Sequence, residues 1–241
     1  MGFQKKEEGG NTNSTYLALI PKESNPSSFN HFRPISLHNS SYKIISKVLA
    51  NQLKPLLPIL IFKNQGAFVP NKKIIDNIML IQEAIHSNMS RNEKTFILKL
   101  DMANAFNCVN HSFLTLVLQK LVFSSDFIAL ITTCINGPWI SPLVNGRLGN
   151  FFQSSRGLRQ GFPLSPFLFI IMEDSLSINL EHNRQNVTIT GIYFSRGIKS
   201  INHSQFVDDT IFLGGASCII AKRIKKILYR IFGGLWLPSK Q

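Results

Sequence analysis

Two adjacent carboxylates enclosed by apolar segments place the strongest constraint on how this chain can fold. Asp208 and Asp209 follow the apolar pair Phe206-Val207, and a second apolar run begins at Ile211. Neighbouring carboxylates repel each other, so the pair requires either a cation between them or a turn that exposes both. A plain hairpin turn with aspartate as the turn former is the alternative to a cation site. The segment by itself favours neither.

A third carboxylate at the end of another strand changes this balance. Asp101 comes directly after the apolar segment 95–100, which predicts a buried strand that ends in an acid. Three carboxylates at the ends of neighbouring strands can hold two Mg²⁺ ions roughly 4 Å apart, an arrangement that activates a 3′-hydroxyl and stabilises a leaving pyrophosphate. On a basic protein, these hard oxygen ligands favour phosphoryl transfer on nucleic acid.

The remaining pattern predicts an α+β fold, because helices alternate with strands without a regular βαβ rhythm. Residues 1–14 are polar and predict a disordered tail, and 24–30 predict a loop. Helical spacing of apolar residues predicts helices over 41–57, 74–88, 112–134 (with a break at 124–126), 166–183 and 219–232. Strands are predicted over 15–21, 95–100, 189–194 and 205–213, and a hairpin over 143–153 around Asn145-Gly146.

The charge balance predicts a polyanionic partner. Lys and Arg number 26 against 13 Asp and Glu, which leaves a net charge of +13. The segment 24–75 holds no acid but carries seven cations: Arg33, Lys43, Lys47, Lys54, Lys63, Lys72 and Lys73. This segment is either a basic surface that favours solubility or a wall that binds phosphates. Its apolar, structured character favours the phosphate-binding interpretation.

Composition excludes several other classes of protein. A hydrophobic content of 44% with 19 Phe excludes a disordered chain, and three isolated Cys exclude a disulfide scaffold or a zinc site. No apolar stretch is long enough to span a membrane, and the N-terminus lacks the apolar region of a secretory signal. We therefore expect a soluble, intracellular protein with no membrane association and no evident protein partner.

Five sequence blocks follow one another in a recognisable order. They are FRPISL at 32–37 with Tyr42-Lys43-Ile44, QGAFVP at 65–70, KLDMANAF at 99–106, GLRQGFPLSP at 157–166, and FVDD at 206–209. In content and order they resemble the reverse transcriptase domain of plant LINE-type (non-LTR) retrotransposons. The resemblance implies a right-hand polymerase fold, with fingers at about 15–94 and a palm at about 95–241. It also implies a retroelement fragment that is truncated before the thumb.

The resemblance assigns a role to each of nine residues. It implies that Asp101, Asp208 and Asp209 are catalytic and hold two Mg²⁺ ions, with Mn²⁺ as a substitute. Phe106 would lie under the sugar and disfavour a ribose 2′-OH. Residues implied to contact the nucleotide or template are Gln160, Gly161, Arg33, Lys43 and Lys72, and Lys72 stands where relatives usually carry Arg.

The implied activity is RNA-directed DNA synthesis, with an RNA template, a DNA primer and dNTPs as partners and the nucleus as its site. One alternative is a catalytically inactive relic that still binds nucleic acid. Another is an RNA-templated RNA polymerase, against which Phe106 and Val207 argue. Two plainer interpretations remain open, a core aromatic for Phe106 and a tight turn for 161–163. Asn104 and Asn107 depart from the family pattern, which usually has Lys and Asp there.

Overall fold

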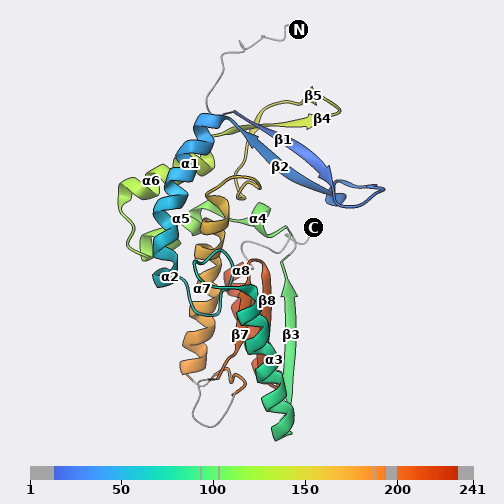
Figure 1. Cartoon of the computed structure of the whole chain (residues 1–241), viewed down its shortest axis with the longest axis vertical. Coiled ribbons are helices and arrows are strands. Elements are labelled where there is room, and N and C mark those ends of the chain that lie inside the picture. Colours follow the sequence, from blue (N-terminus) through green and yellow to red (C-terminus); the bar gives the residue numbers. More distant parts are fainter. Residues whose placement is uncertain (1–13, 93, 103, 187, 194–199, 233–241) are drawn as a thin grey trace.

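A computed structural model of the chain describes residues 14–92, 94–102, 104–186, 188–193 and 200–232. The predicted tail at 1–14 lies outside these ranges except for Ser14, which begins the first strand. Two sheets lie at different levels along the molecule, with the long helix α7 (Ser165–Gln185) beside them (Figure 1). None of the helices within the described ranges is long and apolar enough to cross a membrane. The predicted α+β class is confirmed.

The first sheet has the strand order β2-β1-β4-β5, and β6 also pairs with β4. Its strands are β1 (Ser14–Pro21), β2 (Phe32–His38), β4 (Trp139–Val144), β5 (Arg147–Leu148) and β6 (Phe152–Gln153), and the short 3₁₀ turn Phe29–His31 precedes β2. The predicted hairpin is confirmed, because Asn145 and Gly146 both have positive φ between β4 and β5. The parallel pairing of β1 with β4 joins segments that are far apart in the sequence.

The second sheet is antiparallel, with the order β3-β8-β7. Its strands are β3 (Thr95–Asp101), β7 (His203–Phe206) and β8 (Asp209–Gly215). Phe206 pairs with Asp209, so Val207 and Asp208 form a two-residue turn between β7 and β8. The predicted run 205–213 is therefore a hairpin rather than a continuous strand.

The helices surround the central helix α7. Its first half is mostly apolar, and Leu168, Phe169, Ile171 and Leu176 are fully buried, as expected of a helical segment enclosed by its neighbours. It packs against α5 and α8. The other helices are α1 (Ser40–Leu53), α2 (Leu57–Leu60), α3 (Ile74–Arg91), α4 (Ala105–Cys108), α5 (His111–Lys120), α6 (Ser125–Asn136) and α8 (Cys218–Phe232).

Three further local features differ from the predictions. The helix predicted over 41–57 ends at Leu53 and continues as the 3₁₀ turn Lys54–Leu56 and α2, because Pro55 and Pro58 each lack the N–H that a helix interior needs. Strand β2 was not predicted; it contains Pro34 and lies at a sheet edge, where proline is tolerated. The strand predicted over 189–194 is wrong within 188–193, where Ile192 makes only an isolated bridge with Ile201.

Candidate active site

The two strand-end acids predicted from the sequence lie together at one end of the second sheet. Asp101 is the last residue of β3 and pairs directly with Asp209, the first residue of β8. Asp208 occupies the turn that precedes Asp209. The antiparallel register of β3 and β8 thus brings a carboxylate from the middle of the chain beside the Asp208-Asp209 pair.

A lysine shares this acidic site. Lys99 lies two residues before Asp101 in β3, and its Nζ is 2.9 Å from Oδ1 of Asp209. The hydrogen bond to Asp209 raises the pKa of Lys99, and the charges of Asp101 and Asp208 add to this effect. Burial raises the pKa of Asp208, and the negative charges of Asp209 and Asp101 add to it, while Lys99 opposes it. The three carboxylates therefore interact electrostatically.

The donor set matches the chemistry of a hard divalent cation, since carboxylate oxygens are the ligands that Mg²⁺ and Mn²⁺ prefer. Among the residues that the structure describes, however, no group of three or more His, Cys, Asp or Glu side chains lies close enough to hold a metal ion. In this arrangement the ammonium of Lys99 is the cation that pairs with Asp209.

The turn that carries Asp208 has an unusual backbone. Val207 has a φ of 56°, in the left-handed region that β-branched residues rarely adopt. Its N–H donates to Oε1 of Gln65 at 3.2 Å. The loop that contains Gln65 runs along β7, where the N–H of Gly66 donates to the carbonyl of Gln205 at 2.9 Å. This loop therefore holds the turn from the side.

A buried polar cluster lies behind the turn, and sequence analysis missed it. Glu173 of α7 is fully buried and accepts hydrogen bonds from Gln65 Nε2 at 2.9 Å and Gln205 Nε2 at 3.2 Å, with a weaker one from Thr210 at 3.4 Å. Burial raises the pKa of Glu173 well above its usual range, and the charge of Asp208 adds to this. The sequence signal that could have revealed this cluster is a glutamate within the apolar stretch of α7, because a charged side chain is rarely buried without partners.

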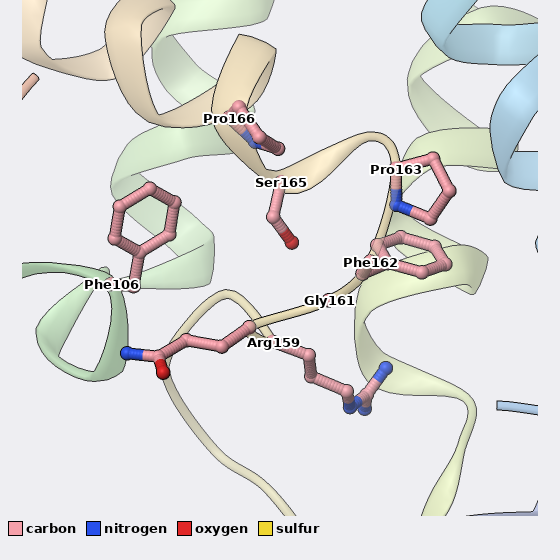
Figure 2. A pocket seen from close by; sticks show the side chains of 8 residues that line it. Phe106, Arg159, Gly161, Phe162, Pro163, Ser165 and Pro166 are labelled. Atoms are coloured by element: carbon pink, nitrogen blue, oxygen red, sulfur yellow. The ribbon is translucent and has the colours of Figure 1, made fainter. Parts of the chain in front are cut away.

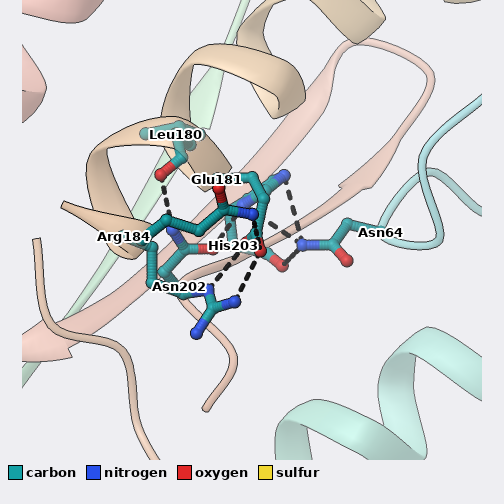
Figure 3. Close-up of polar contacts among 7 residues, drawn as sticks. Asn64, Leu180, Glu181, Arg184, Asn202 and His203 are labelled. Carbon is teal, nitrogen blue, oxygen red and sulfur yellow. Dashed lines mark hydrogen bonds and ion pairs between the residues drawn. The ribbon is translucent and has the colours of Figure 1, made fainter. Parts of the chain in front are cut away.

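The same polar layer continues along β7. His203 is fully buried, and burial lowers its pKa to about 3, so its ring is neutral. Asn64 donates from Nδ2 to the carbonyl of His203 at 2.9 Å, and Nδ1 of His203 lies 2.7 Å from Oδ1 of Asn202 (Figure 3). The contact of Asn64 fastens β7 to the loop before Gln65. Asn202, whose Nδ2 donates to the carbonyl of Leu180 at 3.2 Å, joins this layer to α7.

An open pocket of about 360 Å³ is lined on one side by Phe106 and on the other by the segment from Arg159 to Pro166 (Figure 2). Phe106 of α4 stacks on Phe169 of α7, with ring centroids 4.6 Å apart. The stacking supports the plainer interpretation of Phe106 as a packed aromatic, and its place in the pocket wall agrees with the predicted position beside a ligand. Both features hold for the same side chain.

The segment predicted to contact nucleotide and template lies against β2. The carbonyl of Gln160 accepts from the N–H of Ser36 at 2.9 Å. Gly161 has a φ of 88°, and a Cβ there would lie 3.2 Å from the carbonyl oxygen of Ser36, so glycine allows this close approach. The neighbouring Arg159 donates to the carbonyls of Cys134 and Ile135 at the end of α6, which suits a cation at a helix C-terminus.

The three predicted cations occupy different surroundings. Arg33 is exposed on β2. Lys43 lines a second open pocket of about 380 Å³ on α1. Lys72 is half-buried, and its ammonium donates to the carbonyls of Phe62 and Gln65 at 2.9 Å each. Lys72 thus fastens the loop that holds Gln65, and its predicted contact with a ligand stays a prediction, as do those of Arg33 and Lys43.

Comparison with protein families finds one match across most of the chain. Residues 20–231 match the family described as reverse transcriptase (RNA-dependent DNA polymerase). Among solved structures, a telomerase from Candida albicans in complex with a fragment of telomeric RNA aligns with a TM-score of 0.62 at 14% identity. The alignment covers 93% of this chain and 42% of the telomerase chain. At this identity the likeness shows the fold alone.

Two of the curated relatives come from transposable elements. An uncharacterized 149 kDa protein of transposon TX1 from Xenopus laevis is 28% identical over 211 residues, which is 88% of this chain and 16% of that protein. A Pol polyprotein of the type-1 retrotransposable element R2 from Popillia japonica is 26% identical over 81% of this chain and 26% of its own length. An uncharacterized mitochondrial protein from Arabidopsis thaliana is 41% identical over 68 residues, covering 28% of this chain and 56% of that protein. The chain thus spans about a quarter or less of the two transposon proteins.

Proposed function

The chain belongs to the reverse transcriptase (RNA-dependent DNA polymerase) family, and we propose that it extends a DNA primer on an RNA template by adding dNTPs to the primer 3′-hydroxyl. The observation that carries the proposal is the register of β3 and β8. It pairs Asp101 with Asp209 beside the turn that carries Asp208. Three carboxylates at one sheet end suit the metal-assisted transfer of a phosphoryl group.

In this proposal Asp101, Asp208 and Asp209 hold two Mg²⁺ ions, for which Mn²⁺ can substitute. When bound, the metal would lower the pKa of the attacking hydroxyl and neutralise charge on the leaving pyrophosphate. Lys99 would have to release Asp209 for that carboxylate to face a divalent ion. Burial and the neighbouring negative charges raise the pKa of Asp208, and Asp209 pairs with an ammonium. Both observations support the binding of a cation at this point.

The dNTP would occupy the pocket beside Phe106. The aromatic ring would lie against the sugar and disfavour a 2′-hydroxyl, while Gln160 and Gly161 would contact the nucleotide and template along the opposite wall. Arg33, Lys43 and Lys72 would supply positive charge for the triphosphate or template backbone. A guanidinium can bind phosphate oxygens with two parallel hydrogen bonds, which suits Arg33 best.

Further parts of the proposal concern organisation and origin. Fingers would comprise about 15–94 and a palm about 95–241, although β4, β5 and β6 extend the sheet of β1 and β2. The proposed source is a plant LINE-type (non-LTR) element: the transposon relatives support a retroelement, and the 41% identity to an Arabidopsis protein over 68 residues agrees with a plant. Action on element RNA in the nucleus would follow from that origin.

A second candidate function is nucleic-acid binding without synthesis. One observation favours it: among the described residues the carboxylates do not form a cluster able to hold a metal, and Lys99 pairs with one of them. The net charge of +13 would still attract a nucleic acid.

Primer extension tests the two candidates directly. The purified chain is given an RNA template, a labelled DNA primer, dNTPs and Mg²⁺, beside the double variant Asp208→Ala/Asp209→Ala. We expect extension by the parent, none by the variant, and loss of extension when EDTA removes the metal. Extension that persists in the double variant would contradict the proposed mechanism. Binding of template–primer without extension by either protein would favour the second candidate.

A further inference from the structure

We propose that Glu173 is a positioning residue that fixes the turn carrying Asp208, acting through Gln65. The inference rests on the proposed function only in treating Asp208 as a catalytic carboxylate. Its basis is a continuous series of hydrogen bonds from the interior of α7 to the backbone of Val207.

The first contact in this series is between Glu173 and Gln65. Both residues are buried, and Gln65 Nε2 donates to Oε2 of Glu173 at 2.9 Å. The orientation of the Gln65 amide is fixed at its other end, because Oε1 accepts from two backbone N–H groups, those of Ala67 at 3.0 Å and Val207 at 3.2 Å. The NH₂ group must therefore face Glu173, and its hydrogen bonding depends on that carboxyl.

The second contact reaches β7. Gln205 donates to Oε1 of Glu173 at 3.2 Å, and its own Oε1 accepts from the hydroxyl of Ser177. The Glu173 carboxyl thus binds Gln205, two residues before Val207 in β7, and Gln65, whose other end accepts from the N–H of Val207. On the β8 side of the turn, the hydroxyl of Thr210 lies 3.4 Å from Oε1 of Glu173. Glu173 therefore contacts both strands that carry the turn.

The turn needs such support because of its own backbone. Val207 has a φ of 56°, a conformation that is strained for a β-branched residue and persists only where surrounding contacts enforce it. The hydrogen bond from its N–H to Gln65 is a contact that enforces it. Without Glu173 the Gln65 amide would lose its acceptor and become free to rotate, and Val207 would lose a fixed partner.

The alternative is that Glu173 only stabilises the core, as any buried and hydrogen-bonded polar residue can. The neighbouring Asp174 offers a matched control for that possibility. It is also buried on α7, and its Oδ1 accepts from the N–H of Phe62 at 2.9 Å, a contact with the backbone of the loop that involves neither the Gln65 side chain nor Val207. Asp174→Asn keeps an acceptor for Phe62 and should leave the turn unaffected.

Hydrogen exchange measured by mass spectrometry tests the positioning without requiring activity. We expect faster exchange in the peptide 204–210 for Glu173→Leu and for Gln65→Leu, and unchanged exchange for Asp174→Asn. Glu173→Gln keeps one carbonyl acceptor and should fall between the parent and Glu173→Leu. Exchange at 204–210 that is unchanged in Glu173→Leu, or raised equally in Asp174→Asn, would overturn the proposal. If Glu173→Leu fails to fold, Glu173→Gln and Gln65→Leu decide the same question.

Steady-state kinetics then connect the turn to catalysis. A displaced catalytic carboxylate should lower kcat by roughly a hundredfold in Glu173→Leu and about tenfold in Glu173→Gln, with little change in the KM for dNTP. Asp174→Asn should keep the parental kcat. A kcat unchanged in Glu173→Leu alongside faster exchange at 204–210 would overturn the catalytic part of the proposal. If the parent protein does not extend the primer, the proposed function is contradicted. The exchange data still test whether Glu173 positions the turn.

Discussion

At the scale of single residues, the candidate site combines side chains that sequence patterns reveal with side chains that only the fold reveals. The proximity of Asp101 to the Asp208-Asp209 pair could be predicted, because these acids stand at the ends of apolar strands and paired strands bring such ends together. Gln65 and Glu173 could not be assigned a joint role. They are 108 residues apart in the sequence, and their hydrogen bond depends on where α7 crosses the loop.

The sequence allowed two interpretations of Phe106, a core aromatic or a residue beside the sugar, and the structure shows features of both. Its ring packs on Phe169 and also forms a wall of the pocket. If the ring excludes a 2′-hydroxyl, Phe106→Val should raise incorporation of NTPs relative to dNTPs by about tenfold or more, because a smaller side chain removes the clash. Competitive primer extension with matched NTP and dNTP measures this ratio.

A control must separate this effect from lost packing. Phe113 is a half-buried aromatic of α5 that lies outside the residues lining the pocket, so Phe113→Val removes the same volume elsewhere. It should lower stability without changing the NTP to dNTP ratio. An equal shift of that ratio in both variants would show that Phe106 has no special relation to the sugar.

At the scale of elements, local patterns predicted helices better than strands. The helices α3, α5, α6, α7 and α8 begin and end within a few residues of the predicted bounds, since each carries its own periodicity and caps such as Asn110 and Ser124. Strand β2 was missed because Pro34 is typical of a loop. The pairing of β1 with β4 could not be predicted, because sequence periodicity carries no information about which strands become neighbours.

The position of the short helix α4, which carries Phe106, depends on a close approach at Gly157. A Cβ at Gly157 would lie 2.8 Å from the carbonyl oxygen of Asn107, and the next residue, Leu158, donates from its N–H to the carbonyl of Phe106 at 2.6 Å. Gly157 also has a φ of 91°. We expect Gly157→Ala to lower the free energy of unfolding by about 3 kcal/mol. It should also reduce the rate of dNTP incorporation, because α4, which carries Phe106, must shift.

Gly146 provides the matched control for this substitution. It has a φ of 75°, but a Cβ there would meet nothing within 4 Å. Gly146→Ala should therefore cost only the backbone penalty of about 1 kcal/mol and leave activity unchanged. Urea unfolding of both variants isolates the steric contribution. Equal losses of stability would show that the contact with Asn107 is readily relieved.

At the scale of the whole molecule, charge and fold carry different information. The chain resembles a telomerase in fold at 14% identity, so this architecture tolerates extensive substitution. The net charge of +13 says nothing about the fold, yet it sets how strongly the surface attracts a polyanion. Binding and synthesis can therefore be lost separately, and a test of the molecule as a whole must measure both.

The salt dependence of template binding provides that test. If about five phosphates of a single-stranded RNA are neutralised, affinity should fall roughly a hundredfold between 50 and 200 mM salt, because bound counterions are released. Fluorescence anisotropy with labelled RNA measures the slope.

Because Arg33 and Lys43 are exposed and Lys72 donates to backbone carbonyls, Arg33→Gln/Lys43→Gln should reduce the slope, whereas Lys72→Gln should mainly lower stability. A slope that Arg33→Gln/Lys43→Gln leaves unchanged would show that Arg33 and Lys43 do not neutralise phosphates of the template. Addition of a matched dNTP should tighten binding if the pocket beside Phe106 is functional, and should have no effect on a protein that only binds nucleic acid.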